Sequence, residues 1–251
     1  MGRCLITLGV CSAYSFLSFY NYTAKIIPFS PSEHRYRVAV IDTGIDFSRP
    51  ELAPFKCEGG HASFDGLEVF HQSGNGDTNG HGSAVAWIVA RGLDPKKVCL
   101  SSLRYSMHGP NNLISVLKAW KYIVSEKFDI VNYSGGGEKE SGEETAIITN
   151  LLAKGLTLVV AAGNKSQNLD AECNFFPACH AAHPNFHVVG VTGEVSRLYI
   201  SNYGKAITDY AYGLNDKGLD GQYRTGTSMA AGRVTHRLII KNLDRSVGVA
   251  E

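Results

Sequence analysis

The sequence has no excess of charge of either sign, no internal repeat and no Cys-x-x-Cys pair. Its 24 basic and 23 acidic residues give a net charge of +1, so there is no strong field to attract nucleic acid or an anionic membrane. Without a Cys-x-x-Cys pair, a zinc site or a dithiol redox site has little support. The 251 residues are 44% hydrophobic, which is enough for a sizeable core and favours a single domain.

The N-terminal segment has the pattern of a secretory signal. Arg3 precedes a mostly apolar run over residues 4–19, which is marginally short for a membrane-spanning helix. The alternative is a buried strand or helix, because no clear cleavage site follows the run. We therefore expect residues 1–25 to be a leader, residues 26–251 to form one domain, and the protein to be secreted or extracytoplasmic. Membrane contact is expected only through an uncleaved leader.

Cysteine spacing bears on the redox compartment. Removal of the leader would leave four of the six cysteines, an even number that allows three pairings in an oxidising compartment. Cys173 and Cys179 are close enough in sequence to staple one loop. Cys99 lies in an apolar, strand-like run, which favours a buried free thiol.

Hydrophobic runs alternate with helical patterns along the chain. Continuous apolar runs predict strands at residues 38–41, 98–103, 128–133, 156–161 and 187–191. Apolar residues three or four apart predict helices at residues 81–90, 111–126 and 141–154. This alternation predicts an α/β fold, with a mainly parallel central sheet, helices on both faces and functional residues at the carboxyl ends of the strands. Residues 57–79, rich in glycine and polar residues, are predicted to be loop.

Three segments place an ionisable or nucleophilic side chain beside glycine, in the order Asp, His, Ser. Asp42 ends the strand at 38–41, His81 lies between two glycines, and Ser228 follows a Gly-Thr pair. A serine hydroxyl needs a base to take its proton, and a histidine oriented by a buried carboxylate is the usual base. Asp46 competes with Asp42, but only Asp42 directly ends the strand. Ser228 could instead cap a helix, although the other motifs favour a nucleophile.

A fourth motif places an amide side chain just beyond a buried strand. It is the sequence Ala161-Ala162-Gly163-Asn164. From there Asn164 could donate a hydrogen bond to a developing oxyanion, together with the main-chain amide of Ser228. The alternative is an Asn that closes a turn. The four motifs together predict a hydrolase.

In this order, the motifs resemble those of the subtilisin-like serine proteases (subtilases), over about residues 37–234. The segments that carry the resemblance are Asp42-Thr43-Gly44-Ile45-Asp46, Gly80-His81-Gly82, Ala161-Ala162-Gly163-Asn164 and Gly226-Thr227-Ser228-Met229-Ala230. The order Asp, His, Ser distinguishes this family from chymotrypsin-like enzymes and α/β-hydrolases. The resemblance implies a subtilisin-like fold and a triad of Asp42, His81 and Ser228. It also implies that Asn164 contributes to the oxyanion hole and that an acyl-enzyme forms on Ser228.

The resemblance also implies where the substrate lies. One wall of the pocket for the residue before the cleaved bond would be Ser134, Gly135 and Gly136, and another would be Ala161, Ala162 and Gly163. Phe175 aligns with the pocket floor, where the family often has glycine. Its ring would fill space, which predicts a preference for small or medium side chains.

Two departures from the family pattern concern stability and cofactors. Gly232 and Arg233 stand where the family has proline and histidine, and glycine there predicts a less rigid presentation of Ser228. The shortened C-terminus predicts a less stable domain. Residues 91–97 are a short loop for a high-affinity calcium site, although Glu51 aligns with a family ligand. We therefore expect no cofactor and no such metal site, while a weaker calcium site elsewhere stays open.

The leading prediction is a serine endopeptidase, expected to be a monomer, that acts on polypeptides and binds no nucleic acid. The alternative is a catalytically silent homologue that binds extended peptides along residues 135–137. A sedolisin-like acid peptidase would need a glutamate base and an oxyanion aspartate, where this chain has His81 and Asn164. A neutral to alkaline activity optimum is therefore expected.

Overall fold

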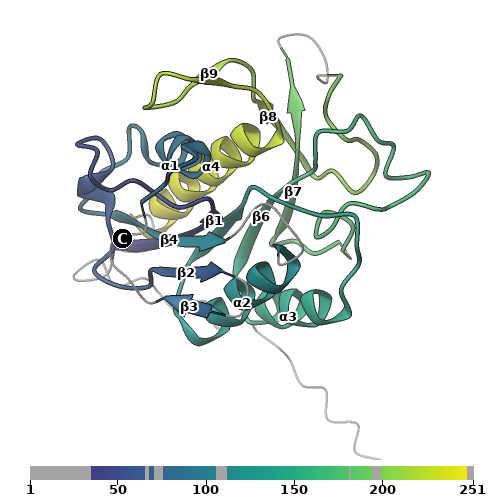
Figure 1. Cartoon of the computed structure of the whole chain (residues 1–251), viewed down its shortest axis with the longest axis horizontal. Coiled ribbons are helices and arrows are strands. Elements are labelled where there is room, and N and C mark those ends of the chain that lie inside the picture. The colour runs from purple at the N-terminus through teal and green to yellow at the C-terminus, as the bar shows by residue number, and fades with distance from the viewer. Residues whose placement is uncertain are drawn as a thin grey trace, which may run out of the picture.

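An eight-stranded sheet runs through the middle of the molecule in the computed structural model (Figure 1), which describes residues 35–65, 68–70, 76–105, 112–180, 182–193 and 199–247. Its strand order is β3-β2-β4-β1-β5-β6-β7-β8, and all neighbouring pairs are parallel except β2 and β3. The strands are β1 (Tyr36–Asp42), β2 (Ala62–Asp65), β3 (Glu68–Phe70), β4 (Val98–Tyr105), β5 (Ile130–Tyr133), β6 (Thr157–Ala161), β7 (Phe186–Thr192) and β8 (Asp209–Tyr212). A separate hairpin joins β9 (Asp216–Lys217) to β10 (Tyr223–Arg224).

Helices cover both faces of the sheet. They are α1 (His81–Ala90), α2 (Asn112–Ser125), α3 (Gly142–Ala153) and α4 (Thr227–Val247), with a 3-10 turn, η1 (Ala53–Phe55). The helices α1 and α4 pack together on one face, while α2 and α3 pack on the other (Figure 1). Within the residues that the structure describes, no helix is both long enough and apolar enough to cross a bilayer. The predicted α/β class and its mainly parallel sheet are confirmed.

The central strand β1 is covered by helices on both faces, which accounts for the continuous apolar run at residues 38–41. Val38 and Val40 are buried in the core shared with α1 and α4, whereas Ala39 and Ile41 are buried in the core shared with α2 and α3. Successive side chains of a strand point to opposite faces, so a strand covered on both faces must be apolar at every position. The run ends at Asp42, where the strand reaches the carboxyl edge of the sheet.

The prediction of a loop over residues 57–79 was wrong in part. The strands β2 and β3 lie within it, and β2 adds to the sheet beside β4. In β2, Ala62 and Phe64 are buried, while the intervening Ser63 is more exposed. Such a short alternating segment, flanked by glycine and polar residues, has too few positions for its period to stand out.

The prediction of a free thiol at Cys99 was also wrong. Cys99 forms a disulfide with Cys57, with a Cα–Cα distance of 5.0 Å across 42 residues of sequence. The main-chain amide of Cys57 donates to the carbonyl of Leu100 at 3.1 Å, which brings the two cysteines side by side. Sequence spacing gives no sign of this approach, because it depends on how the chain returns to β4. The predicted staple between Cys173 and Cys179 is confirmed.

The segment after Ser228 is held by contacts that the sequence did not reveal. The helix α4 continues through Gly232, where a methyl group would lie 3.2 Å from Cγ2 of Ile88, so glycine permits close packing against α1. Arg233 binds both carboxylate oxygens of Asp216 at 2.5 Å and the carbonyl of Tyr212 at 3.0 Å. The guanidinium therefore ties α4 to the β8–β9 region. How rigidly Ser228 is presented stays a prediction.

Candidate active site

The predicted catalytic side chains meet at the carboxyl edge of the sheet. Asp42 is the last residue of β1, His81 is the first residue of α1, and Ser228 is the second residue of α4. Ser134 follows β5 directly, and Asn164 follows β6 after two residues. Parallel strands deliver their following loops to one edge, which is how residues far apart in sequence come together.

The pairing of Asp42 with His81 is formed. Oδ1 of Asp42 accepts from Nδ1 of His81 at 2.7 Å and from the main-chain amide of Thr43 at 2.7 Å, and Asp42 is only 1% exposed. Because Nδ1 carries the proton, Nε2 is the nitrogen left to accept one. Asp46 is excluded from this role, since its carboxylate binds Ser48 and Arg49 instead.

The surroundings of His81 raise its pKa above the usual value. Burial is the largest single influence and lowers the pKa, because desolvation disfavours the charged ring. The charge of Asp42 and its hydrogen bond act in the opposite direction and together outweigh burial. Asp77 also raises the pKa, whereas the Arg224 guanidinium lowers it. His81 is therefore a stronger base than a free histidine.

If His81 acts as the base, peptidase activity should fall on acidification with a midpoint above 6.5, the ordinary pKa of histidine. Replacing Arg224 by Gln should move this midpoint further up, because the charge of Arg224 lowers the pKa of His81. The measurement is kcat/KM against pH. Arg237→Gln is the matched control, since Arg237 pairs with Asp209 and does not act on His81.

As the pH is lowered, the loss of activity caused by protonation of His81 should occur before the protein unfolds. A raised folded pKa means that the charged ring stabilises the fold; this contribution is present below the unfolded pKa and is lost as the pH rises through the folded pKa. Far-UV circular dichroism should therefore stay unchanged across the acid limb. A midpoint below 6.5, or a limb that coincides with unfolding, would contradict this assignment of the base.

Two residues that the sequence reasoning missed hold His81 in place. Asp77 accepts from the hydroxyl of Thr43, the amide of Gly80 and the amide of Ser83, each at 2.8 Å. The hydroxyl of Thr43 in turn accepts from the amide of Gly82 at 2.9 Å. These bonds satisfy main-chain donors around the first turn of α1 and link it to the end of β1. The sequence did contain a signal for this role of Asp77, since it is an acidic residue four positions before His81.

Ser228 lies at the start of α4 and is 8% exposed. Its hydroxyl donates to the main-chain carbonyl of Ser134 at 3.2 Å. Ser228 and His81 both lie in the described part of the chain, and they share no hydrogen bond. The third link of the predicted triad is thus not made in this state. Catalytic hydrogen bonds are often absent or long before substrate binds, and a hydroxyl can turn about one single bond.

A series of buried side-chain hydrogen bonds holds Ser134 in place. Nδ2 of Asn132 donates to Oγ of Ser134 at 2.9 Å, and Oδ1 of Asn132 accepts from the hydroxyl of Thr235 at 2.8 Å. Asn132 and Thr235 are both 0% exposed. The sequence reasoning missed both, although a polar residue inside the apolar run of β5 was a usable signal.

Asn164 is oriented by Thr227, the residue before Ser228. Its Oδ1 accepts from the amide of Thr227 at 2.9 Å and from the Thr227 hydroxyl at 3.0 Å. The same hydroxyl accepts from the amide of Gly163 at 3.2 Å. With Oδ1 engaged, the amide nitrogen of Asn164 is the group left to donate, and the residue is exposed. This geometry is compatible with the predicted oxyanion role.

Phe175 occupies the space between the two predicted pocket walls. A methyl group at Gly136 would lie 2.5 Å from two atoms of the Phe175 ring, and one at Gly163 would lie 3.0 Å from it. The ring therefore touches both glycines and leaves no room for a side chain on either. Of the other predicted wall residues, Ser134, Ala161 and Ala162 are buried, and Gly135 packs beside the hydroxyl of Tyr105.

Glu51, the residue aligned with a calcium ligand, is exposed on the surface. In the part of the chain that the structure describes, no three His, Cys, Asp or Glu side chains gather as they would around a metal ion. The expectation about calcium stays a prediction.

Comparisons with known proteins show the family of the chain. The model of the subtilase family matches residues 34–240. The major intracellular serine protease of Bacillus subtilis is 29% identical over 218 residues, which cover 81% of this chain and 67% of that protein. A subtilisin of Bacillus pumilus is 27% identical over 212 residues, which cover 79% of this chain and 73% of that protein. For Bacillus subtilis subtilisin E, the matched part is 53% of its length.

Solved structures agree in fold. A cold-adapted subtilisin-like serine proteinase superposes with a TM-score of 0.68 at 23% identity, covering 84% of this chain and 76% of its own. A lanthipeptide protease superposes with a TM-score of 0.65 at 19% identity, covering 80% and 70%. Because these sequence identities are low, the two structures support the fold alone.

Proposed function

Because the chain belongs to the subtilase family, we propose that it is a serine endopeptidase that hydrolyses peptide bonds through an acyl-enzyme on Ser228. The observation that carries the proposal is the 2.7 Å pairing of Asp42 with His81 at the same edge of the sheet as Ser228. A buried carboxylate that orients a histidine beside a serine is an arrangement suited to acyl transfer.

In the proposed reaction, Ser228 Oγ attacks the scissile carbonyl while Nε2 of His81 takes the hydroxyl proton. Asp42 keeps the proton on Nδ1 and stabilises the imidazolium that forms. His81 then passes its proton to the leaving amine, and a water repeats the sequence to release the acid. The oxyanion would receive hydrogen bonds from Asn164 and from the amide of Ser228, at the positive end of α4.

Substrate binding would also free the nucleophile. The hydroxyl of Ser228 now donates to the carbonyl of Ser134, which is the acceptor that an extended peptide alongside residues 134–137 would use. A peptide N–H bound there would displace the hydroxyl, and Nε2 of His81 would become its acceptor. The resting hydrogen bond and the active one thus compete for the same proton.

The ring of Phe175 supports a preference for small or medium side chains before the cleaved bond. Replacing Phe175 by Ala would remove the ring that touches Gly136 and Gly163. The ratio of kcat/KM for a leucine substrate to that for an alanine substrate should then rise by on the order of tenfold. Peptide libraries that vary this one residue measure the ratio. An unchanged ratio would mean that Phe175 does not border the subsite.

The disulfides support a secreted or extracytoplasmic site of action. The pairs Cys57–Cys99 and Cys173–Cys179 account for all four cysteines outside the first 25 residues. Such bonds persist in oxidising compartments. We propose that the protein acts there on polypeptides, as a monomer.

A fluorophosphonate probe tests the proposal, since it reacts with an activated serine. Wild-type protein should be labelled at Ser228, as located by peptide mass mapping, and His81→Ala should abolish labelling. Absence of labelling in folded wild-type protein would contradict the enzyme and would favour a silent, peptide-binding homologue.

A further inference from the structure

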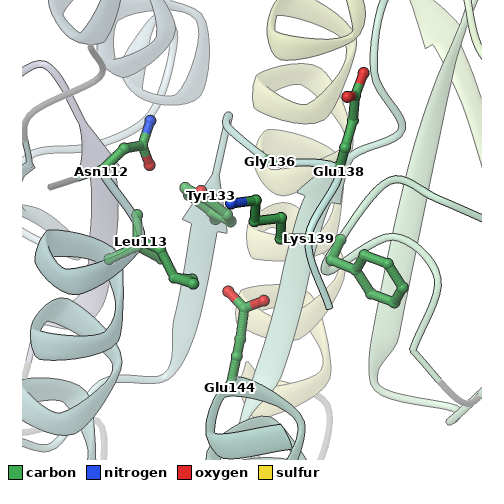
Figure 2. Close-up of a pocket in the computed structure, with 10 residues that line it drawn as sticks. Asn112, Leu113, Tyr133, Gly136, Glu138, Lys139 and Glu144 are labelled. Carbon is green, nitrogen blue, oxygen red and sulfur yellow. The ribbon is translucent and has the colours of Figure 1, made fainter. Parts of the chain in front are cut away.

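A second pocket lies beside the glycine segment that follows β5. It has a volume of about 260 Å³ and is bounded by the start of α2, the end of β5, residues 136–139 and the start of α3 (Figure 2). Leu113, Val116 and Phe176 line its apolar part. Side chains that can bind a charged or polar group come from Glu138, Lys139 and Glu144.

Glu144 places a buried carboxylate in this pocket. The residue is 3% exposed, and its Oε1 accepts from Nε1 of Trp120 at 2.9 Å. Its Oε2 lies 3.8 Å from Nε2 of His180, too far for a hydrogen bond, and makes no hydrogen bond to any other described residue. Figure 2 shows the carboxylate pointing from α3 into the pocket. One oxygen of a buried acid is therefore available to a ligand.

The local sequence offers Glu144 a different partner, which it does not use. Ser141 caps α3 and accepts from the amide of Glu144 at 3.3 Å, as in a capping box. In a capping box the Glu side chain would return to the amide of the capping residue, but here it turns inward to Trp120. Glu144 lies in the first turn of α3, where the helix dipole stabilises a negatively charged side chain.

None of the other charged residues that line the pocket pairs with Glu144, whose one ionic contact among the described residues is the 3.8 Å approach of His180 Nε2. Glu138 forms an ion pair with Lys165, the residue after Asn164. Lys139 is exposed and forms no ion pair with another described residue. Figure 2 shows its side chain extending toward Tyr133. A cationic side chain of the chain itself thus lines the same pocket as Glu144.

We propose that this pocket takes a lysine or arginine side chain of the polypeptide substrate and that Glu144 is the residue that selects it. The inference rests on the proposed function for the placement of the substrate. A peptide extended along residues 134–137 advances about 3.3 Å per residue, so three of its residues cover about 10 Å. The basic residue is therefore about three positions before the residue whose carbonyl is attacked.

Binding measurements on Ser228→Ala protein test the proposal without requiring catalysis. Labelled peptides would carry arginine, lysine, citrulline or norleucine at each position before the cleavage site, and fluorescence anisotropy gives Kd. Arginine and lysine should bind on the order of tenfold more tightly than citrulline and norleucine at one position, since a hydrogen bond to a charged group contributes that much. Glu144→Gln in the same background should abolish the difference, because Gln can still accept from Trp120.

Glu143→Gln is the matched control. Glu143 precedes Glu144 in the same turn of α3, but it is half exposed and pairs with Lys121 outside the pocket. This variant should keep the preference. Lys139→Glu adds a second carboxylate at the pocket and should increase the preference by about threefold; it also serves as the test if Glu144→Gln fails to fold.

Three results would overturn the proposal: no position prefers a cation, the preference survives Glu144→Gln, or Glu143→Gln removes it equally. In each case, Glu144 would only join Trp120 to the loop of His180. Failure of the proposed function is read separately, from absence of fluorophosphonate labelling in wild-type protein. A labelled wild type without a cation preference contradicts this inference alone.

Discussion

Replacing Ser228 by Ala should lower kcat/KM for peptide hydrolysis by roughly a million-fold, the size known for the equivalent serine of subtilisin. The change removes the attacking oxygen. It also removes one hydrogen bond, from the hydroxyl to the carbonyl of Ser134, which contributes about 1 kcal/mol to stability. The fold should therefore survive, and steady-state cleavage of a fluorogenic peptide beside a thermal melt separates the two effects.

A matched control is Ser102→Ala in β4. Ser102 is 1% exposed, and its hydroxyl has no hydrogen-bond partner among the described residues, so it resembles Ser228 in burial but lies outside the site. This variant should keep full activity. If Ser228→Ala retained the activity of wild type, the nucleophile would have to be another group.

Replacing Asp42 by Asn should lower kcat/KM by about ten-thousand-fold, as the equivalent change does in a trypsin-like protease. The carboxylate accepts two hydrogen bonds at Oδ1, while Oδ2 is buried without a partner among the described residues. An asparagine that keeps its oxygen toward His81 buries an unpaired amide, and one that turns the amide toward His81 reverses the tautomer. Either way, the imidazolium loses its counter-charge.

Asp46→Asn is the control for this change, because Asp46 lies four residues away and binds Ser48 and Arg49. It should leave kcat/KM within about twofold of wild type. Single-turnover acylation measures the chemical step in each variant. Equal rates for Asp42→Asn and wild type would show that the 2.7 Å pairing does not orient the base.

Much of the fold could be predicted because its strands are buried on both faces. The run that ends at Asp42 is apolar at every position, as β1 requires, and the helical spacing after His81 gave the start of α1 correctly. The same logic placed Asp42, His81 and Asn164 at one edge of the sheet. Parallel strands impose this convergence, so the candidate site followed from their order.

The remaining features depend on contacts between distant segments. Cys57 meets Cys99 only because the chain before β2 returns to β4. Thr235 reaches Asn132 across 103 residues, and no local pattern indicates which buried polar groups will pair. The contact of the Glu144 side chain with Trp120 could not be predicted either, because the local sequence fits a capping box equally well.

The helix α4 presents Ser228 and also closes one face of the sheet against α1. The proposed nucleophile is thus carried by an element that cannot move away without exposing the hydrophobic core. A molecule that loosens this helix separates its nucleophile from the imidazole in the same event. Loosening of α4 and loss of peptide cleavage are therefore expected to occur together.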